Sequence, residues 1–110
     1  MVNFGQVQRR IQNWLDRFFP EYSLVFKDWE GKASLITLRE FPTPQKIVLL
    51  GASAIVHRWK EDVKRAIGSK RAAQLRQAAT NSIGLTEGLT AAKIELRTLL
   101  EQYGLFFETA

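Results

Sequence analysis

The sequence predicts an all-α fold of about six helices in a small bundle, with a longer, coiled-coil-like helix at the C-terminal end. Apolar residues recur at intervals of three and four through most of the chain, which is the spacing of one face of an α-helix. Prolines and glycines divide the chain at regular intervals, and no Asn-Gly turn or sustained alternation of apolar and polar residues favours a β-hairpin. At 110 residues, 45% of them hydrophobic, the chain has the size of one small domain.

The first predicted helix begins near the N-terminus and ends at Pro20, because a proline disfavours helical geometry in the residue before it. Its apolar residues are spaced three or four apart: Phe4, Val7, Ile11, Trp14, Leu15 and Phe18. The next residues, EYSLVF, are compatible with a helix or with extended chain. Asp28 and Gly31 then occupy the first and last positions of DWEG, which predicts a type I turn.

Two helices are predicted around the remaining prolines. The apolar residues of the second helix share one face: Leu35, Ile36, Leu38 and Phe41. Pro42 stops this helix. Thr43 and Pro44 predict the start of a third, since threonine caps free amide groups and proline fits the first helical position. The third helix, QKIVLL, is short and ends at Gly51.

Two more helices are predicted from serine caps and glycine stops. Ser53 caps the fourth helix, AIVHRWKEDVKRAI, which Gly68 closes. Ser69 caps the fifth, KRAAQLRQAATNS, with Gly84 beyond its end.

The sixth helix, capped by Thr86 and running toward Tyr103, carries the sharpest pattern. Its apolar residues alternate at spacings of four and three over three heptads, the seam of a coiled coil. The residues of this seam that we expect to form a dimer interface are Leu85, Leu89, Ala92, Leu96, Leu99 and Tyr103. Phe106 continues the spacing. The first helix has a shorter seam of the same kind, so the two helices pair either with each other or with absent partners.

The boundaries follow from these elements. We expect residues 1–84 to form a helical bundle region and residues 85–110 to form the heptad-bearing helix of the same single domain. Gly104 costs about 1 kcal/mol relative to alanine inside a helix, so we expect fraying after Tyr103 and an atypical tail.

Composition excludes several classes of function. The chain has no cysteine, which excludes disulfides, thiolate nucleophiles and cysteine-based metal sites. The first residues lack the features of a signal peptide, and no apolar run approaches the ~20 residues that span a membrane. We therefore expect a cytoplasmic protein with no membrane partner.

The charge surplus is concentrated in one segment. Residues 57–76 carry seven bases and two acids, whereas the rest of the chain carries nine of each. The pairs Arg58–Asp62 and Glu61–Arg65 are four residues apart and are expected to form ion pairs. The bases left without a partner, which we expect to contact a nucleic-acid phosphate backbone without sequence preference, are Lys60, Lys64, Lys70, Arg71 and Arg76.

The sequence gives no reason to expect catalysis by this chain alone. His57, the only histidine, points away from the apolar face of its helix and is expected at the surface. Glu61 and Asp62 diverge by about 100° on a helix and cannot converge on one metal. There is no phosphate-binding loop, dinucleotide fingerprint or nucleophile elbow. We expect no catalytic residue, no metal, no cofactor and no small-molecule substrate.

Two longer stretches of the sequence have distinctive wording that can be compared with known families. They are WLDRFFPEYSLVFKDWEGKASLITLREFPTP at residues 14–44 and SIGLTEGLTAAKIELRTLLEQY at residues 82–103. The first overlaps VQRRIQNWLDRFFPEY and ends in FPTP. Both runs resemble the middle, helical and coiled-coil part of the DEDD-type transposases of the one-ten/one-sixteen insertion-sequence family. The resemblance covers nearly the whole chain, to about Tyr103, but includes no catalytic motif.

What this resemblance implies is an architectural role in DNA transposition and recombination. The family's acidic metal ligands would lie upstream of Met1 and its serine domain downstream of Ala110, so no catalytic residue carries over. The helices would join the catalytic parts, pair between protomers and contact DNA or a guide RNA. The tail from Gly104 departs from the family, which predicts a truncated or frameshifted copy or an expressed fragment.

Two alternatives to this role stay open. In the first, the chain is a free-standing helical interaction or regulatory module that does not bind nucleic acid. In the second, it is a small DNA-binding protein whose residues 69–82 enter the major groove with Lys70, Arg71, Gln74 and Gln77. Aromatic residues between the first helices are expected to pack at helix junctions, with stacking on bases as the alternative. These residues are Phe18, Phe19, Tyr22, Phe26, Trp29 and Phe41.

Overall fold

The computed structural model describes residues 3–63 and 68–108, and within those ranges the regular structure is entirely helical. The helices are α1 (Phe4–Phe18), α2 (Tyr22–Val25), α3 (Lys32–Glu40), α4 (Pro44–Asp62), α5 (Ser69–Thr80) and α6 (Leu89–Glu108). The predicted all-α fold is confirmed.

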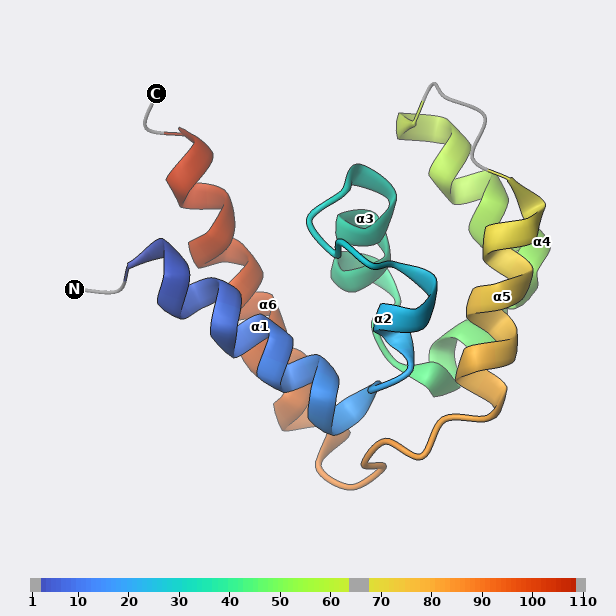
Figure 1. Cartoon of the computed structure of the whole chain (residues 1–110), viewed down its shortest axis with the longest axis horizontal. Coiled ribbons are helices and arrows are strands. Elements are labelled where there is room, and N and C mark those ends of the chain that lie inside the picture. The colour runs from blue at the N-terminus through green and yellow to red at the C-terminus, as the bar shows by residue number, and fades with distance from the viewer. Residues whose placement is uncertain (1–2, 64–67, 109–110) are drawn as a thin grey trace.

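The helices form two pairs with a smaller layer between them (Figure 1). Helices α1 and α6 run antiparallel on one side of the molecule, and α4 packs against α5 on the other. Between the pairs, α2 contacts α5 and α3 contacts α6. The molecule measures 40 × 35 × 21 Å, and α1 and α6 bring the two ends of the chain to the same side.

Helix α1 begins and ends where the sequence predicts. Asn3 caps it by accepting a 2.8 Å hydrogen bond from the backbone N–H of Gln6, and the Gln6 side chain accepts one from the backbone N–H of Asn3. The residues that α1 buries are Val7, Ile11, Trp14, Leu15 and Phe18. The predicted apolar face is therefore the packed face.

The centre of the molecule is aromatic. All six aromatic residues predicted to pack at helix junctions are buried, which leaves none of them free to stack on a base. Two polar contacts are buried with them: Trp59 Nε1 donates to Thr37 Oγ1 at 2.9 Å, and the hydroxyls of Tyr22 and Ser34 lie 2.7 Å apart. Because buried polar groups are costly when unpaired, these contacts fix how α2, α3 and α4 fit together.

The turn and the caps between α2 and α4 agree with prediction. Within EYSLVF, which is compatible with helix or extended chain, Tyr22–Val25 form the short helix α2. In the DWEG turn, Gly31 N–H donates to the backbone oxygen of Asp28, and Asp28 Oδ1 accepts from Glu30 N–H at 3.0 Å. Thr43 caps α4 by accepting a hydrogen bond from the backbone N–H of Lys46 at 3.3 Å.

Gly51 divides α4 into two helical segments. Its φ of 81° and ψ of 160° are non-helical, and a positive φ of this kind favours glycine. The predicted stop at Gly51 is thus present as a sharp break inside α4.

Helix α6 differs from prediction at both ends. It begins at Leu89, after Gly88 with a φ of 69°, rather than at a Thr86 cap. It also continues through Gly104 to Glu108, so the prediction of fraying after Tyr103 is wrong. The physical reason is packing: the ring of Phe4 lies 5.2 Å from that of Phe106, and aromatic contacts of this kind offset the cost of one glycine.

One smaller correction concerns α5. Ser69 is its first helical residue rather than its cap, and Gly68 takes the cap position without a side-chain hydrogen bond.

The connection from α5 to α6 is attached to the end of α1. Glu21 accepts hydrogen bonds from Ser82 Oγ at 2.6 Å and from the backbone N–H of Ile83 at 3.0 Å. Partial burial acts to raise the pKa of Glu21, but these hydrogen bonds together hold it below its usual value. The backbone N–H of Leu85 also donates to the carbonyl oxygen of Arg17 at 2.8 Å. These bonds position α6 to run back along α1.

Candidate nucleic-acid interface

The predicted dimer seam is covered by α1 of the same chain. Leu85 is 55% exposed and Leu89 is half-buried, whereas the other four seam residues are buried in the core. These four are Ala92, Leu96, Leu99 and Tyr103. The apolar stripe of α1 matches the seam, and the attached connection places the two helices side by side. In this structure the seam is an intramolecular contact, and the four residues are not available to a second chain.

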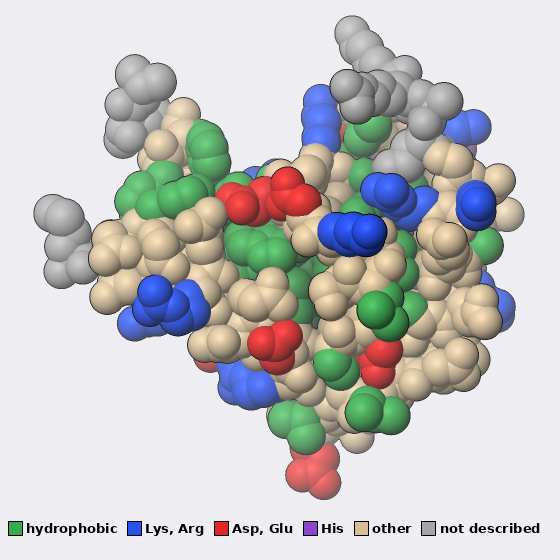
Figure 2. Space-filling view, viewed as in Figure 1, with side chains coloured by type: hydrophobic (Ala, Val, Ile, Leu, Met, Phe, Trp, Pro, Cys, Tyr) green, Lys and Arg blue, Asp and Glu red, His purple; other side chains and the backbone are tan. Residues whose placement is uncertain are grey.

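The predicted basic residues lie on the α4–α5 pair. Lys60 is exposed near the end of α4, and Lys70, Arg71 and Arg76 are exposed on α5. Lys64 lies outside the described residues. Blue side chains gather over this side of the molecule at the upper right of Figure 2. The structure therefore places four of the five predicted residues on the surface of one helical pair, and we call these four residues the α4–α5 basic face. On α5 the three bases point about 100–140° apart, so they spread over the surface of the pair rather than meeting at one point.

Helix α5 shows why its bases point outward. It buries only three side chains, Ala72, Leu75 and Ala79, along a narrow stripe that faces its neighbours. No acidic residue occurs between Ser69 and Thr80, so the remaining surface of α5 is basic or neutral. Small buried residues let α5 approach α4 closely while its long polar side chains stay in solvent.

The acids near this face are engaged by one residue. Arg58 binds Glu40 through two guanidinium nitrogens, Asp62 at 2.9 Å and Glu61 at 3.5 Å. The predicted Arg58–Asp62 pair is confirmed, whereas Arg65 lies outside the described residues. The hydrogen bonds to Glu40 and Asp62 raise the pKa of Arg58 above its usual value.

The bases of the α4–α5 basic face take no part in these pairs. Within residues 3–63 and 68–107, no carboxylate lies within 4 Å of the cationic groups of Lys60, Lys70, Arg71 or Arg76. Arg71 has one further contact, because its guanidinium lies 5.4 Å from the centre of the Phe26 ring. Arg71 is thus held in place, while the other three are restrained by no ion pair.

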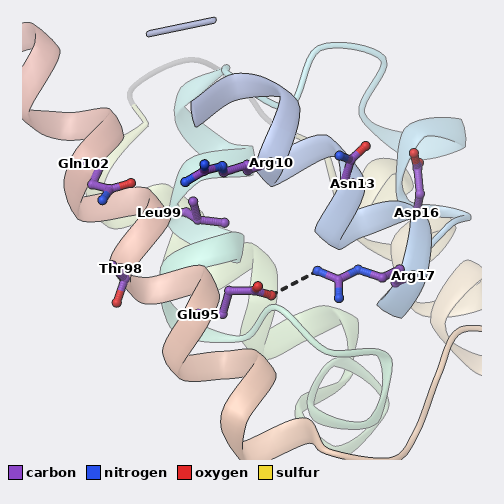
Figure 3. A pocket seen from close by; sticks show the side chains of 8 residues that line it. All are labelled: Arg10, Asn13, Asp16, Arg17, Glu95, Thr98, Leu99 and Gln102. Atoms are coloured by element: carbon purple, nitrogen blue, oxygen red, sulfur yellow. Dashed lines mark hydrogen bonds and ion pairs between the residues drawn. The ribbon is translucent and has the colours of Figure 1, made fainter. Parts of the chain in front are cut away.

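An open groove of about 790 Å³ lies on the surface where α1 and α6 meet, lined by side chains of both helices (Figure 3). Arg17 Nη2 forms an ion pair with Glu95 Oε1 at 3.0 Å across it, and Figure 3 shows Arg10 reaching from α1 toward α6. Gln102 Oε1 is buried there without a hydrogen-bond partner in the described structure. The one hydroxyl among the lining residues, Thr98 Oγ1, donates to the backbone carbonyl oxygen of Ile94 at 3.1 Å.

The acidic residues of the DWEG turn have structural roles. Glu30 Oε1 accepts hydrogen bonds from the Tyr103 hydroxyl at 2.7 Å and from Gln8 Nε2 at 3.0 Å, and Asp28 stabilises its turn. His57 is exposed, as predicted. Among the residues described, no three histidine or acidic side chains come together as metal ligands. None of the described helices is both long enough and apolar enough to cross a membrane.

A second basic cluster was missed by sequence reasoning. Arg39 from α3, Lys46 from α4, and Lys93 and Arg97 from α6 line one small pocket at the junction of the three helices. We call it the junction pocket. Its residues are up to 58 positions apart in the sequence and lie in segments of balanced charge, so no local signal points to it.

Comparisons of the chain with protein-family models, with curated proteins and with solved structures gave no match. The transposase resemblance therefore stays a prediction from the sequence.

Proposed function

We propose that this chain is a non-catalytic helical module that binds nucleic acid through the phosphate backbone. The observation that carries the proposal is the α4–α5 basic face, where Lys60, Lys70, Arg71 and Arg76 are exposed and none is in an ion pair within the described structure. Unpaired surface cations attract a polyanion and release its counterions on binding.

The charge pattern favours contact with phosphates over other partners. The face presents lysine and arginine side chains on two packed helices without an intervening acid on α5, and α5 presents no large apolar side chain to solvent. A helix-binding surface would need exposed apolar anchors. A charged, sequence-independent contact needs only the cations.

Reading of base edges by α5 is a second candidate function. Lys70, Gln74 and Gln77 are spaced four and three apart and are all exposed on the outer face of the helix. Glutamine and lysine are side chains that read adenine and guanine in the major groove. The outer face of α5 is free to enter a groove because its packing contacts lie on the opposite side.

A place in transposition rests on the sequence resemblance alone. We propose that the module serves a bacterial insertion-sequence transposase by holding DNA or a structured guide RNA while other segments supply catalysis. Self-association through the seam would require α1 to leave α6, or the two helices to exchange between chains, because α1 occupies the seam here.

The test is a binding titration of the chain with a short DNA duplex and with a hairpin RNA at several salt concentrations. The variant Lys60→Gln/Lys70→Gln/Arg76→Gln removes three exposed cations of the α4–α5 basic face. We expect at least a tenfold loss of affinity for all sequences, and a salt dependence flattened by about 0.9 in log–log slope for each lost phosphate contact.

The matched control removes three exposed cations elsewhere, Arg9→Gln/Lys27→Gln/Lys32→Gln, and so has the same net charge. We expect it to keep affinity within about threefold. An equal loss in both variants, or no binding by the unmodified chain, contradicts the proposal. Gln74→Ala/Gln77→Ala tests the second candidate, since lost discrimination between sequences at an unchanged salt slope indicates base reading.

A further inference from the structure

The junction pocket has the composition of an anion site. It has a volume of about 160 Å³ and lies where the end of α3, the start of α4 and the middle of α6 meet. Three helices contribute its four cationic side chains, Arg39, Lys46, Lys93 and Arg97. The fold thus concentrates cations that the sequence keeps apart.

The single carboxylate that lines the pocket is already paired with a cation that is not among the pocket's lining residues. Glu40 is bound by Nε and Nη2 of Arg58, one guanidinium nitrogen to each carboxylate oxygen. A planar guanidinium that meets both oxygens of a carboxylate forms the strongest common type of ion pair. In the described structure Glu40 thus pairs with Arg58 and with none of the four cations, and one carboxylate could balance only one of them.

No other acid of the described structure takes that role. No carboxylate described lies within 4 Å of the cationic groups of Arg39, Lys46, Lys93 or Arg97. Glu101 lines a neighbouring groove with Arg39 and Arg97 but forms no ion pair with either. Lys93 and Arg97 are four residues apart on α6, a spacing at which like charges destabilise a helix. An anion bound between them would remove this repulsion.

We propose that the junction pocket binds a phosphate group. Arginine presents paired donors that match two oxygens of a phosphate, and lysine adds a compact charge. A volume of about 160 Å³ admits a tetrahedral oxyanion, since a water molecule takes about 30 Å³ of liquid volume. The phosphate comes either from a free phosphate or phosphomonoester, or from a nucleic-acid backbone. The site uses none of the residues of the α4–α5 basic face and stands independently of the proposed function.

The first experiment titrates the full chain with inorganic phosphate by calorimetry, with sodium chloride at matched ionic strength as the control for general salt effects. The pocket variant is Lys93→Gln/Arg97→Gln, and the control variant Arg9→Gln/Lys27→Gln removes two exposed cations elsewhere and has the same net charge. If free phosphate is the ligand, the unmodified chain and the control variant bind it alike, and the pocket variant binds at least tenfold more weakly.

The second experiment titrates the same three proteins, and a Lys60→Gln/Lys70→Gln variant of the α4–α5 basic face, with the short DNA duplex. If backbone phosphate is the ligand, the pocket variant binds the duplex at least fivefold more weakly than the unmodified chain, whether or not inorganic phosphate binds. If the Lys60→Gln/Lys70→Gln variant binds the duplex as tightly as the unmodified chain, the proposed function fails and the phosphate-site proposal does not. The phosphate-site proposal is overturned if the pocket variant matches the unmodified chain with both ligands, or if neither ligand binds.

Folding of the variants is checked by thermal unfolding. Lys93 and Arg97 are exposed, and their replacement by glutamine relieves repulsion, so we expect an unchanged or raised Tm. Lys46→Gln approaches the same pocket from α4 and gives a second, single-residue test of phosphate binding. Arg97→Lys keeps the positive charge, so in place of Arg97→Gln it is expected to restore part of the affinity for phosphate. A variant that had lost its fold would not recover in this way.

Discussion

The indole Nε1 of Trp14 donates a 2.8 Å hydrogen bond to the backbone carbonyl oxygen of Ala92, joining α1 to α6 across 78 positions of sequence. Trp14 is 0% exposed, and its ring lies 5.0 Å from that of Phe18. An apolar interface alone permits small slips of one helix along the other, whereas a directed hydrogen bond does not. This contact fixes the alignment of the two terminal helices.

Trp14→Phe keeps an aromatic ring but removes the donor and part of the volume. We expect the free energy of unfolding to fall by about 2–4 kcal/mol, from the lost hydrogen bond and the space left in the core. Urea unfolding followed by circular dichroism measures the change. Trp29→Phe is the matched control, because Trp29 is also buried but its indole nitrogen has no hydrogen-bond partner in the described structure. An equal effect of both substitutions would contradict a special role for the hydrogen bond.

Leu96→Asp tests whether the seam is internal. Leu96 is 1% exposed beneath α1, so the substitution removes core packing and buries a carboxylate. We expect the free energy of unfolding to fall by about 4 kcal/mol or more, which is a large part of the total stability of a small domain. We expect the unmodified chain to be a monomer in light scattering.

Leu105→Asp is the control for Leu96→Asp, because Leu105 is on the same helix but 57% exposed. It is expected to change stability by less than about 1 kcal/mol. A dimeric unmodified chain that Leu96→Asp converts to a folded monomer would show instead that the seam pairs two chains.

Two glycines are expected to respond oppositely to alanine. A Cβ at Gly84 would overlap the backbone carbonyl of Phe18, so Gly84→Ala should push the connection off α1 and cost about 1–3 kcal/mol. A Cβ at Gly104 would meet nothing within 4 Å inside α6, so Gly104→Ala should stabilise by about 0.5–1 kcal/mol. Urea titration of both variants measures the difference, and a destabilising Gly104→Ala would contradict the continuous helix.

Both tyrosines are expected to resist ionisation in the folded chain. Burial raises the pKa of Tyr22 above its usual value of about 10, against hydrogen bonds to Ser34 and Thr37 that lower it. Burial also raises the pKa of Tyr103, and the hydrogen bond to Glu30 and the nearby negative charge of Asp28 add to the effect.

The consequence is a loss of stability in alkali. Because the folded-state pKa values exceed the unfolded value of about 10, the stabilisation is complete below pH 10 and is lost as the pH rises through the folded-state values. Ultraviolet absorbance of tyrosinate should therefore rise together with unfolding. A tyrosinate transition near pH 10 in a chain that remains folded would contradict this prediction.

Much of the fold could be predicted from local sequence. Pro20, Pro42, Thr43 and Gly51 act on the backbone of their immediate neighbours, and the helix ends and the break that they predict are present. Gly104 was misread because its cost is smaller than the packing of aromatic rings on Phe4, a contact between the two ends of the chain. A heptad seam predicts that a helix is covered but not which chain covers it.

Of the two candidate sites, one could be predicted from local sequence and the other could not. The α4–α5 basic face was visible as a charge surplus because its residues are close in sequence. The junction pocket was not, because Arg39, Lys46 and Arg97 meet only when α3, α4 and α6 are packed. The engagement of Glu40 by Arg58, which leaves the pocket without a counterion, also depends on tertiary structure.

The antiparallel arrangement of α1 and α6 determines how the molecule responds to tension. Phe4 lies against Phe106 and Phe107, so a pull on the two ends acts first on these rings and then on each successive layer between the helices. The helices would peel apart layer by layer at low force rather than slide past each other all at once. A larger protein that contained this segment would therefore have a mechanically soft joint at its point of attachment, with the aromatic core and the α4–α5 pair left intact beyond it.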